Sequence, residues 1–125
     1  MPTDFHTALF FLGRLLLGGA FVVFGVRNIG NLERLTGVMV KKNVPQARPL
    51  IMLGIAIQIV GGLMVATGVL AAWGAAALIA FLILAVYLFH DFWAYSGPER
   101  TPHLNAWIMN LALSGGFLMV IALSA

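Results

Sequence analysis

Four long apolar segments, each close to the length needed to cross a lipid bilayer, follow one another along this sequence. They occupy about residues 5–26, 49–70, 72–90 and 104–124. An α-helix rises ~1.5 Å per residue, so about 20 residues span a hydrocarbon core of ~30 Å. The segments are continuously apolar and do not alternate, which argues against a transmembrane β-barrel. The pattern predicts an all-α integral membrane four-helix bundle, with one transmembrane domain covering residues 1–125.

The composition supports a chain whose main solvent is lipid. Hydrophobic residues make up 62% and charged residues 9%, whereas a soluble domain is about half apolar and about a quarter charged. Cysteine is absent, which excludes disulfides, thiol redox chemistry and thiolate metal sites. We predict no metal site, and any redox role would need a bound cofactor or a partner to carry the electrons.

The connection between the first two spans carries its own helical pattern. Leu32, Leu35 and Met39 recur at helical spacing, while charged residues occupy other positions. This predicts a short amphipathic helix over about residues 31–42, lying in the membrane interface. An ordinary surface helix is the alternative. The basic residues expected to contact lipid headgroups are Arg34, Lys41, Lys42 and Arg48.

The basic residues outside the spans are confined to two connections. Residues 27–48 carry Arg27, Arg34, Lys41, Lys42 and Arg48, and residues 91–103 carry Arg100. Because cytoplasmic loops are enriched in Lys and Arg, we expect both connections to be cytoplasmic and both termini to lie outside. No basic cluster is interleaved with aromatic residues, so the expected partner is the lipid bilayer and not nucleic acid.

Arg14 is a charged residue inside the first apolar segment, on the same helical face as Gly18, Phe21 and Gly25. A charge near the bilayer centre costs at least about 2.5 kcal/mol, so we expect a compensating interaction. Arg14 lies about 13 Å from the outer end of its span and Gln58 about 13 Å from the inner end of the second, so the two can meet near mid-membrane. Arg14 is then either structural, reaching outward or bonding free carbonyls, or a donor to a membrane ligand.

Other polar side chains within or beside the spans are candidate contacts for a quinone or a lipid. With Arg14, the set comprises Gln58, His90, Asp91, Asn110 and Ser114. His90 and Asp91 begin a polar group that continues to His103, and a histidine with a carboxylate can relay a proton to a bound quinone. The alternative is that these residues are interhelical hydrogen-bond partners and interface anchors. Haem is not expected, because His6 lies on the opposite side from His90 and His103.

Several short motifs occur in an order that resembles a known family. They are Leu12-Gly-Arg-Leu-Leu-Leu-Gly18, the segment 25–30, Val44-Pro45, Gln58-x-x-Gly61-Gly62, Phe89-His-Asp-Phe-Trp93 and Asn110-Leu-Ala-Leu-Ser-Gly-Gly116. Over essentially its whole length the chain is similar to the DoxX-like small membrane proteins. The resemblance implies a four-helix bundle in the bacterial cytoplasmic membrane. It also implies association with quinone-linked oxidoreductases, including thiosulfate:quinone and terminal quinol oxidase systems.

These expectations leave three functions open. The first is a small accessory subunit of a quinone-linked oxidoreductase, which contributes to a pocket for a noncovalently bound quinone or lipid or docks a protein partner of the redox complex. The second is a stand-alone transporter or lipid-binding protein that forms a homo-oligomer, although no broken helix or inverted repeat is evident. A scaffold that only positions another protein is the third. In none of these cases do we expect catalysis by the chain alone, and the sequence identifies no catalytic residues.

Overall fold

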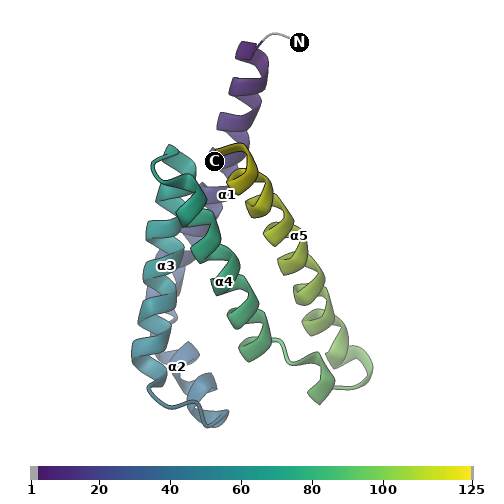
Figure 1. Ribbon diagram of the computed structural model, residues 1–125. Helices are drawn as coiled ribbons and strands as arrows, with labels where there is room; N and C mark the ends of the chain where they lie inside the picture. The colour runs from purple at the N-terminus through teal and green to yellow at the C-terminus, as the bar shows by residue number, and fades with distance from the viewer. Residues whose placement is uncertain (1–2, 125) are drawn as a thin grey trace.

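The computed structural model describes residues 3–124, which fold into four long helices and a short one (Figure 1). The long helices are α1 (Thr3–Gly30), α3 (Ala47–Thr67), α4 (Ala71–Phe89) and α5 (Arg100–Ser124). The short helix is α2 (Leu32–Lys41), and two 3-10 turns, η1 (Phe92–Ala94) and η2 (Gly97–Glu99), join α4 to α5. All four long helices are long and apolar enough to cross a membrane. The predicted all-α fold with four candidate spans is therefore confirmed.

The helix ends differ from the predicted boundaries where the backbone adopts special geometry. Helix α3 ends at Thr67 and not at residue 70, because Gly68 follows with a left-handed φ of +84°. Leu70 also has a positive φ, of +50°, and α4 begins directly after it. This short turn makes α3 and α4 adjacent antiparallel helices. Pro49 lies in the first turn of α3, where its missing N–H removes no helical hydrogen bond.

Helices α1 and α3 pack so closely that their backbones approach van der Waals contact. A Cβ atom on Gly18 would lie 2.6 Å from the backbone nitrogen of Ala66. A Cβ atom on Gly62 would likewise lie 2.6 Å from the carbonyl oxygen of Gly18. Further along α1, a Cβ atom on Gly25 would lie 2.6 Å from Cγ1 of Ile59 and 3.1 Å from Cβ of Gln58. Glycine permits such approach, which is a main packing device between helices in lipid. The contacts also fix an antiparallel register in which Gly18 lies opposite Gly62.

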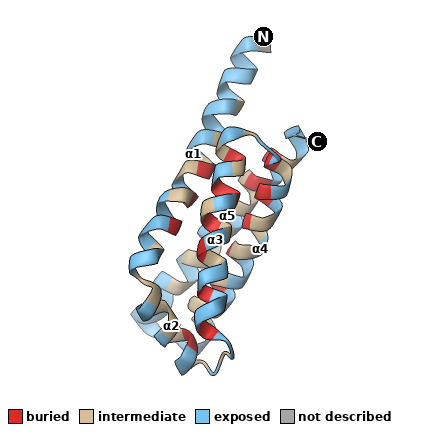
Figure 2. Ribbon diagram, turned by 90° about the vertical axis from the view of Figure 1, so that its left-hand side faces the viewer, coloured by how far each residue is buried: buried red, intermediate tan, exposed pale blue. Residues whose placement is uncertain are grey.

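The remaining helices close the bundle around a core of buried side chains. Val65 of α3 and Leu78 of α4 are fully buried, and Phe117 of α5 packs edge-on against Phe21 of α1 with ring centroids 5.3 Å apart. Figure 2 shows the buried residues on the inner faces of the helices and exposed residues around the outside. Many of these exposed side chains are large and apolar, such as Leu16 at 65% exposure. A bilayer would cover such a surface, whereas water would not.

Helix α2 is docked on the bundle by its apolar side. Met39 is 2% exposed and packs with Ala47, Ile51 and Ile55 of α3. Asn31 occupies the N-cap position of α2, but its side chain makes no capping hydrogen bond. The predicted amphipathic helix is present, but much of its apolar face is covered by α3 and so does not face the interface.

One end of the bundle is formed by α2, the connection after α4 and the start of α5. We call it the basic end, because it carries Arg34, Lys41, Lys42, Arg48 and Arg100. The α3–α4 turn lies at the opposite end, beyond which the first turns of α1 extend (Figure 1).

Candidate functional site

Arg14 lies at the end of the bundle opposite the basic end, and not in the middle of the bundle. Its guanidinium lies against Gly68, so closely that a Cβ atom there would clash with Nη1. The Cζ atom of Arg14 is 5.0 Å from the ring centroid of Phe10. The expected meeting of Arg14 with Gln58 is wrong. The contact of Gly18 with Gly62 brings Arg14 level with the C-terminal end of α3, at Gly68. A depth counted from the end of the apolar segment therefore placed Arg14 too close to the middle of the bundle.

The surroundings of Arg14 favour a structural role for part of its side chain. Its Nε atom is buried and has no hydrogen-bond partner among the residues that the structure describes. The guanidinium nevertheless lies beside the C-terminus of α3, where a positive charge interacts favourably with the helix dipole.

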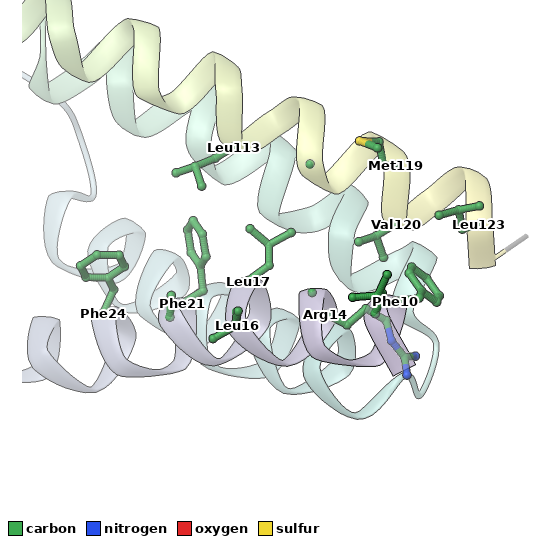
Figure 3. A pocket seen from close by; sticks show the side chains of 14 residues that line it. Phe10, Arg14, Leu16, Leu17, Phe21, Phe24, Leu113, Met119, Val120 and Leu123 are labelled. Carbon is green, nitrogen blue, oxygen red and sulfur yellow. The ribbon is translucent and has the colours of Figure 1, made fainter. Parts of the chain in front are cut away.

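A groove of about 510 Å³ runs between α1 and α5 at this end of the molecule. Figure 3 shows Leu17 and Phe21 of α1 facing Leu113 and Val120 of α5. Arg14 contributes to the wall, but its guanidinium points away from α5 (Figure 3). The groove is therefore an apolar surface against which an acyl chain can lie, and Arg14 does not aim its charge into it.

Gln58 is a buried polar residue of α3, at 4% exposure. Its Oε1 atom accepts a hydrogen bond of 3.0 Å from Nδ2 of Asn28, in the last turns of α1. Asn28 was not among the predicted site residues, because it follows the end of the first apolar segment. The close approach of Gly25 to Gln58 brings the two amides together.

Asn110 and Ser114 both donate hydrogen bonds to backbone carbonyls. Nδ2 of Asn110 donates a hydrogen bond of 3.2 Å to the backbone carbonyl of Leu82 in α4. Oγ of Ser114 donates to the backbone carbonyl of Asn110, one turn earlier, at 2.8 Å. The bond of Asn110 matches the alternative in which this residue is an interhelical hydrogen-bond partner, whereas the bond of Ser114 lies within α5.

Two histidines meet at the basic end. Nδ1 of His90, directly after α4, lies 3.1 Å from Nδ1 of His103 in the first turn of α5. The ring of Tyr95 stacks on that of His103, with centroids 4.3 Å apart and planes 16° apart. Nε1 of Trp107 donates a hydrogen bond of 2.7 Å to the backbone carbonyl of His90. His90 and His103 were expected in one polar group, but the sequence pattern does not predict the direct contact between the two imidazoles.

Ion pairs at the basic end engage two of the residues expected to contact lipid headgroups. Nζ of Lys42 lies 3.0 Å from a carboxylate oxygen of Asp91, which ties α2 to the end of α4. Arg48 forms an ion pair with Glu33 on the surface of α2. Arg34 and Lys41 are exposed. Lys42 is therefore a link between helices, whereas headgroup contact by Arg34, Lys41 and Arg48 stays a prediction.

A cavity of about 790 Å³ lies between α2, α3 and α4, and both the Asn28–Gln58 pair and the two histidines line it. Its walls are mainly apolar, with Ile55 and Phe81 among the lining residues. The polar residues that line it are Asn28, Arg34, Lys42, Gln58, His90, Tyr95, His103 and Asn110. Within residues 3–124, no group of three or more His, Asp or Glu side chains could hold a metal ion. The arrangement suits a largely apolar ligand with a few hydrogen-bonding atoms.

Comparison with known proteins decides the family. A sequence model of the family described as DoxX matches residues 9–91. The chain belongs to the DoxX family. No curated protein and no solved structure matches the chain.

The DoxX match divides the candidate site. It includes Arg14, Gln58, His90 and Asp91, and it ends before His103. The whole of α5, with Asn110 and Ser114, lies outside the matched residues, so the resemblance seen in the sequence extends further than the match. The matched residues therefore include most of α1 and all of α3 and α4. His103, which contacts His90, belongs to α5 and lies outside the match.

Proposed function

We propose that this protein is an accessory membrane subunit of a quinone-linked oxidoreductase and that it holds a quinone in the cavity near the basic end. The observation that carries the proposal is the cavity itself. It is mainly apolar, has a volume of about 790 Å³, and is lined at one end by His90, Tyr95 and His103. DoxX membership supports a small membrane protein as the setting for this cavity.

The residues around the cavity fit a quinone by size and by chemistry. Pockets for small ligands usually measure about 300–1,000 Å³ and combine apolar walls with a few polar groups. Apolar walls suit a quinone ring and its isoprenoid tail, and the two carbonyl oxygens need hydrogen-bond donors. Nδ1 of His90 and Nδ1 of His103 contact each other, and when Nδ1 of His90 is the acceptor, its Nε2–H remains to donate to a carbonyl. A bound quinone would supply two-electron redox chemistry, which the apolar and amide side chains cannot.

We place the basic end on the cytoplasmic side of a bacterial inner membrane, with both termini outside. The support is the gathering of Arg34, Lys41 and Arg100 at that end. Because the chain has no cysteine, single cysteines can report sidedness. In intact cells, a membrane-impermeant thiol reagent is expected to label Thr7→Cys and to spare Lys41→Cys until the membrane is opened. The reverse labelling would invert the topology.

Purification from native membranes in mild detergent tests the function directly. We expect quinone and a redox subunit to copurify with the protein in stoichiometric amounts. Ala85→Phe places a ring in the cavity, since Ala85 is one of its lining residues, and should lower the quinone content about tenfold or more, equivalent to about 1.4 kcal/mol of binding free energy. Ala76→Phe is the matched control, because Ala76 is exposed on the same helix and is not part of the lining.

The same purification tests the alternative function. The groove between α1 and α5 is lined by apolar side chains and favours an acyl chain as its occupant. If the protein purifies as a homo-oligomer with bulk phospholipid and without quinone, the accessory-subunit proposal fails and lipid binding or transport takes its place. Equal quinone content in the Ala85→Phe and Ala76→Phe variants would show that the quinone binds elsewhere.

A further inference from the structure

We propose that His103 and His90 form a proton-transfer pair that carries protons from the aqueous phase at the basic end to a quinone in the cavity. The inference rests on the proposed function, because the quinone accepts the protons. Its basis is the direct contact between the two imidazoles, with 3.1 Å between their Nδ1 atoms, at a position where both side chains line the cavity.

The chemistry of imidazole makes this contact a proton path. A neutral imidazole has an N–H on one ring nitrogen and a lone pair on the other. When two Nδ1 atoms meet, one ring donates its N–H and the other accepts. Each ring then has its Nε2 atom left for a further partner. A proton added at Nε2 of one ring can therefore be released, after transfer through the Nδ1 contact, from Nε2 of the other.

Reduction of a quinone to a quinol requires two electrons and two protons. A redox partner protein supplies the electrons, and the histidines supply the protons. Water gives a proton to Nε2 of His103, whose Nδ1 proton passes to Nδ1 of His90, and His90 releases its Nε2 proton to a quinone oxygen. Both rings end neutral in the opposite tautomer, so one passage delivers one proton. Before the second passage, water gives a proton to Nε2 of His90, the Nδ1 proton of His90 returns to His103, and His103 releases its Nε2 proton to water, which restores the first tautomer.

The surroundings hold the pair in place for this transfer. Tyr95 stacks on the ring of His103, and the Trp107 side chain donates a hydrogen bond to the backbone carbonyl of His90. The stacking orients the ring of His103, and the hydrogen bond holds the backbone of His90. The titratable side chains that face His90 are His103 of α5, Lys42 of α2 and Asp91, and the last two form an ion pair of 3.0 Å. The ammonium group of Lys42 therefore has a carboxylate beside it next to the imidazole pair.

Two other roles for the pair give different expectations. A purely structural latch between α4 and α5 would need only a hydrogen bond, which asparagine can also make. Asparagine keeps a polar atom near the position of Nδ1 but cannot take up and release a proton, so His103→Asn separates the latch from the relay. A metal site would need further ligands, and the described residues offer no group of three.

Nitrogen NMR on the ¹⁵N-histidine-labelled protein tests the shared proton without any quinone. The chain has three histidines, so the spectrum is simple. We expect His90 and His103 to titrate in two coupled steps, and His90 to titrate in a single step in the His103→Asn variant. His6 is exposed on α1 and serves as the internal reference. Independent single-step titration of all three histidines would overturn the relay.

Electrode-driven reduction of quinone, with the protein in lipid discs, tests the transfer itself. His103→Asn should slow proton-coupled reduction about a hundredfold, leave quinone affinity within about twofold, and regain its rate when imidazole is added. His6→Asn should match the wild type. An unchanged rate, or a parallel loss of affinity and rate, would overturn the relay. Failure of the wild type to bind quinone would contradict the proposed function as well, whereas failure of the NMR titration alone contradicts only the relay.

Discussion

Replacing Gly18 by alanine is expected to lower the free energy of unfolding of the bundle by about 2–3 kcal/mol, the upper range for overpacking. The added Cβ atom would lie 2.6 Å from the backbone nitrogen of Ala66 and would also clash with the carbonyl oxygen of Gly62. Both neighbours are backbone atoms, which cannot rotate away as a side chain can. The helices can accept the methyl group only by separating, and this weakens the other contacts between α1 and α3 as well.

Unfolding in bicelles, followed by steric trapping or by titration with a denaturing detergent, measures this loss. Gly62→Ala should have a similar effect, because its Cβ atom would lie 2.6 Å from the carbonyl oxygen of Gly18. Gly13→Ala and Gly19→Ala are the controls, since a Cβ atom at either position meets nothing within 4 Å. If Gly18→Ala is as stable as Gly13→Ala, α1 does not pack on α3 through this face.

Hydrophobic length was sufficient to predict the four spans but not their relative heights. Each apolar segment is long enough to require a membrane or a buried helix, so the number of spans follows from the sequence. The height of α1 depends on which glycine meets which partner, and Gly18 and Gly62 set it. Counting from the segment ends placed Arg14 beside Gln58, whereas this register places Arg14 beside Gly68.

Small residues at four-residue spacing do not by themselves identify a packing face. Gly62 and Ala66 have this spacing and face α1. Ala76 and Ala80 of α4 have the same spacing but are exposed, and the buried face of α4 contains Gly74 instead. Lipid tails are as apolar as the side chains of a helix interface, so composition alone does not distinguish the two environments.

The candidate site was predicted as a group of residue types and not as a set of contacts. His90 and Asp91 were identified from their place at the end of a span, and Asn110 from its polarity within one. The contact between His90 and His103 depends on the two 3-10 turns that return the chain to α5, which no periodic pattern predicts. Asn28 was not predicted as a site residue, because the apolar segment ends near residue 26 whereas α1 continues to Gly30.

Truncating Phe117 to alanine is expected to lower the free energy of unfolding by about 3–5 kcal/mol, the range for buried Phe→Ala substitutions. Phe117 is 0% exposed, and its ring packs edge-on against that of Phe21, with 5.3 Å between centroids. Within the described chain, α5 packs chiefly against α4 and the 3-10 turns, so Phe117 supplies an important contact of α5 with α1. Its loss leaves a cavity that neighbouring side chains fill only in part.

Leu118→Ala is the control for Phe117→Ala. Comparing the stability losses of the two variants separates the effect of burial from the effect of alanine on helix propensity. Leu118 is the next residue of α5 and is 58% exposed, so its truncation removes contacts with lipid and little packing within the protein. Phe117→Leu should fall between the two variants, because leucine refills part of the space. Equal stability of the alanine variants, measured by the same unfolding titration, would mean that α5 is not held by this ring. Because α5 also carries His103, the Phe117→Ala variant should loosen the imidazole pair, and the coupled titration of the two histidines should then disappear together with the lost stability.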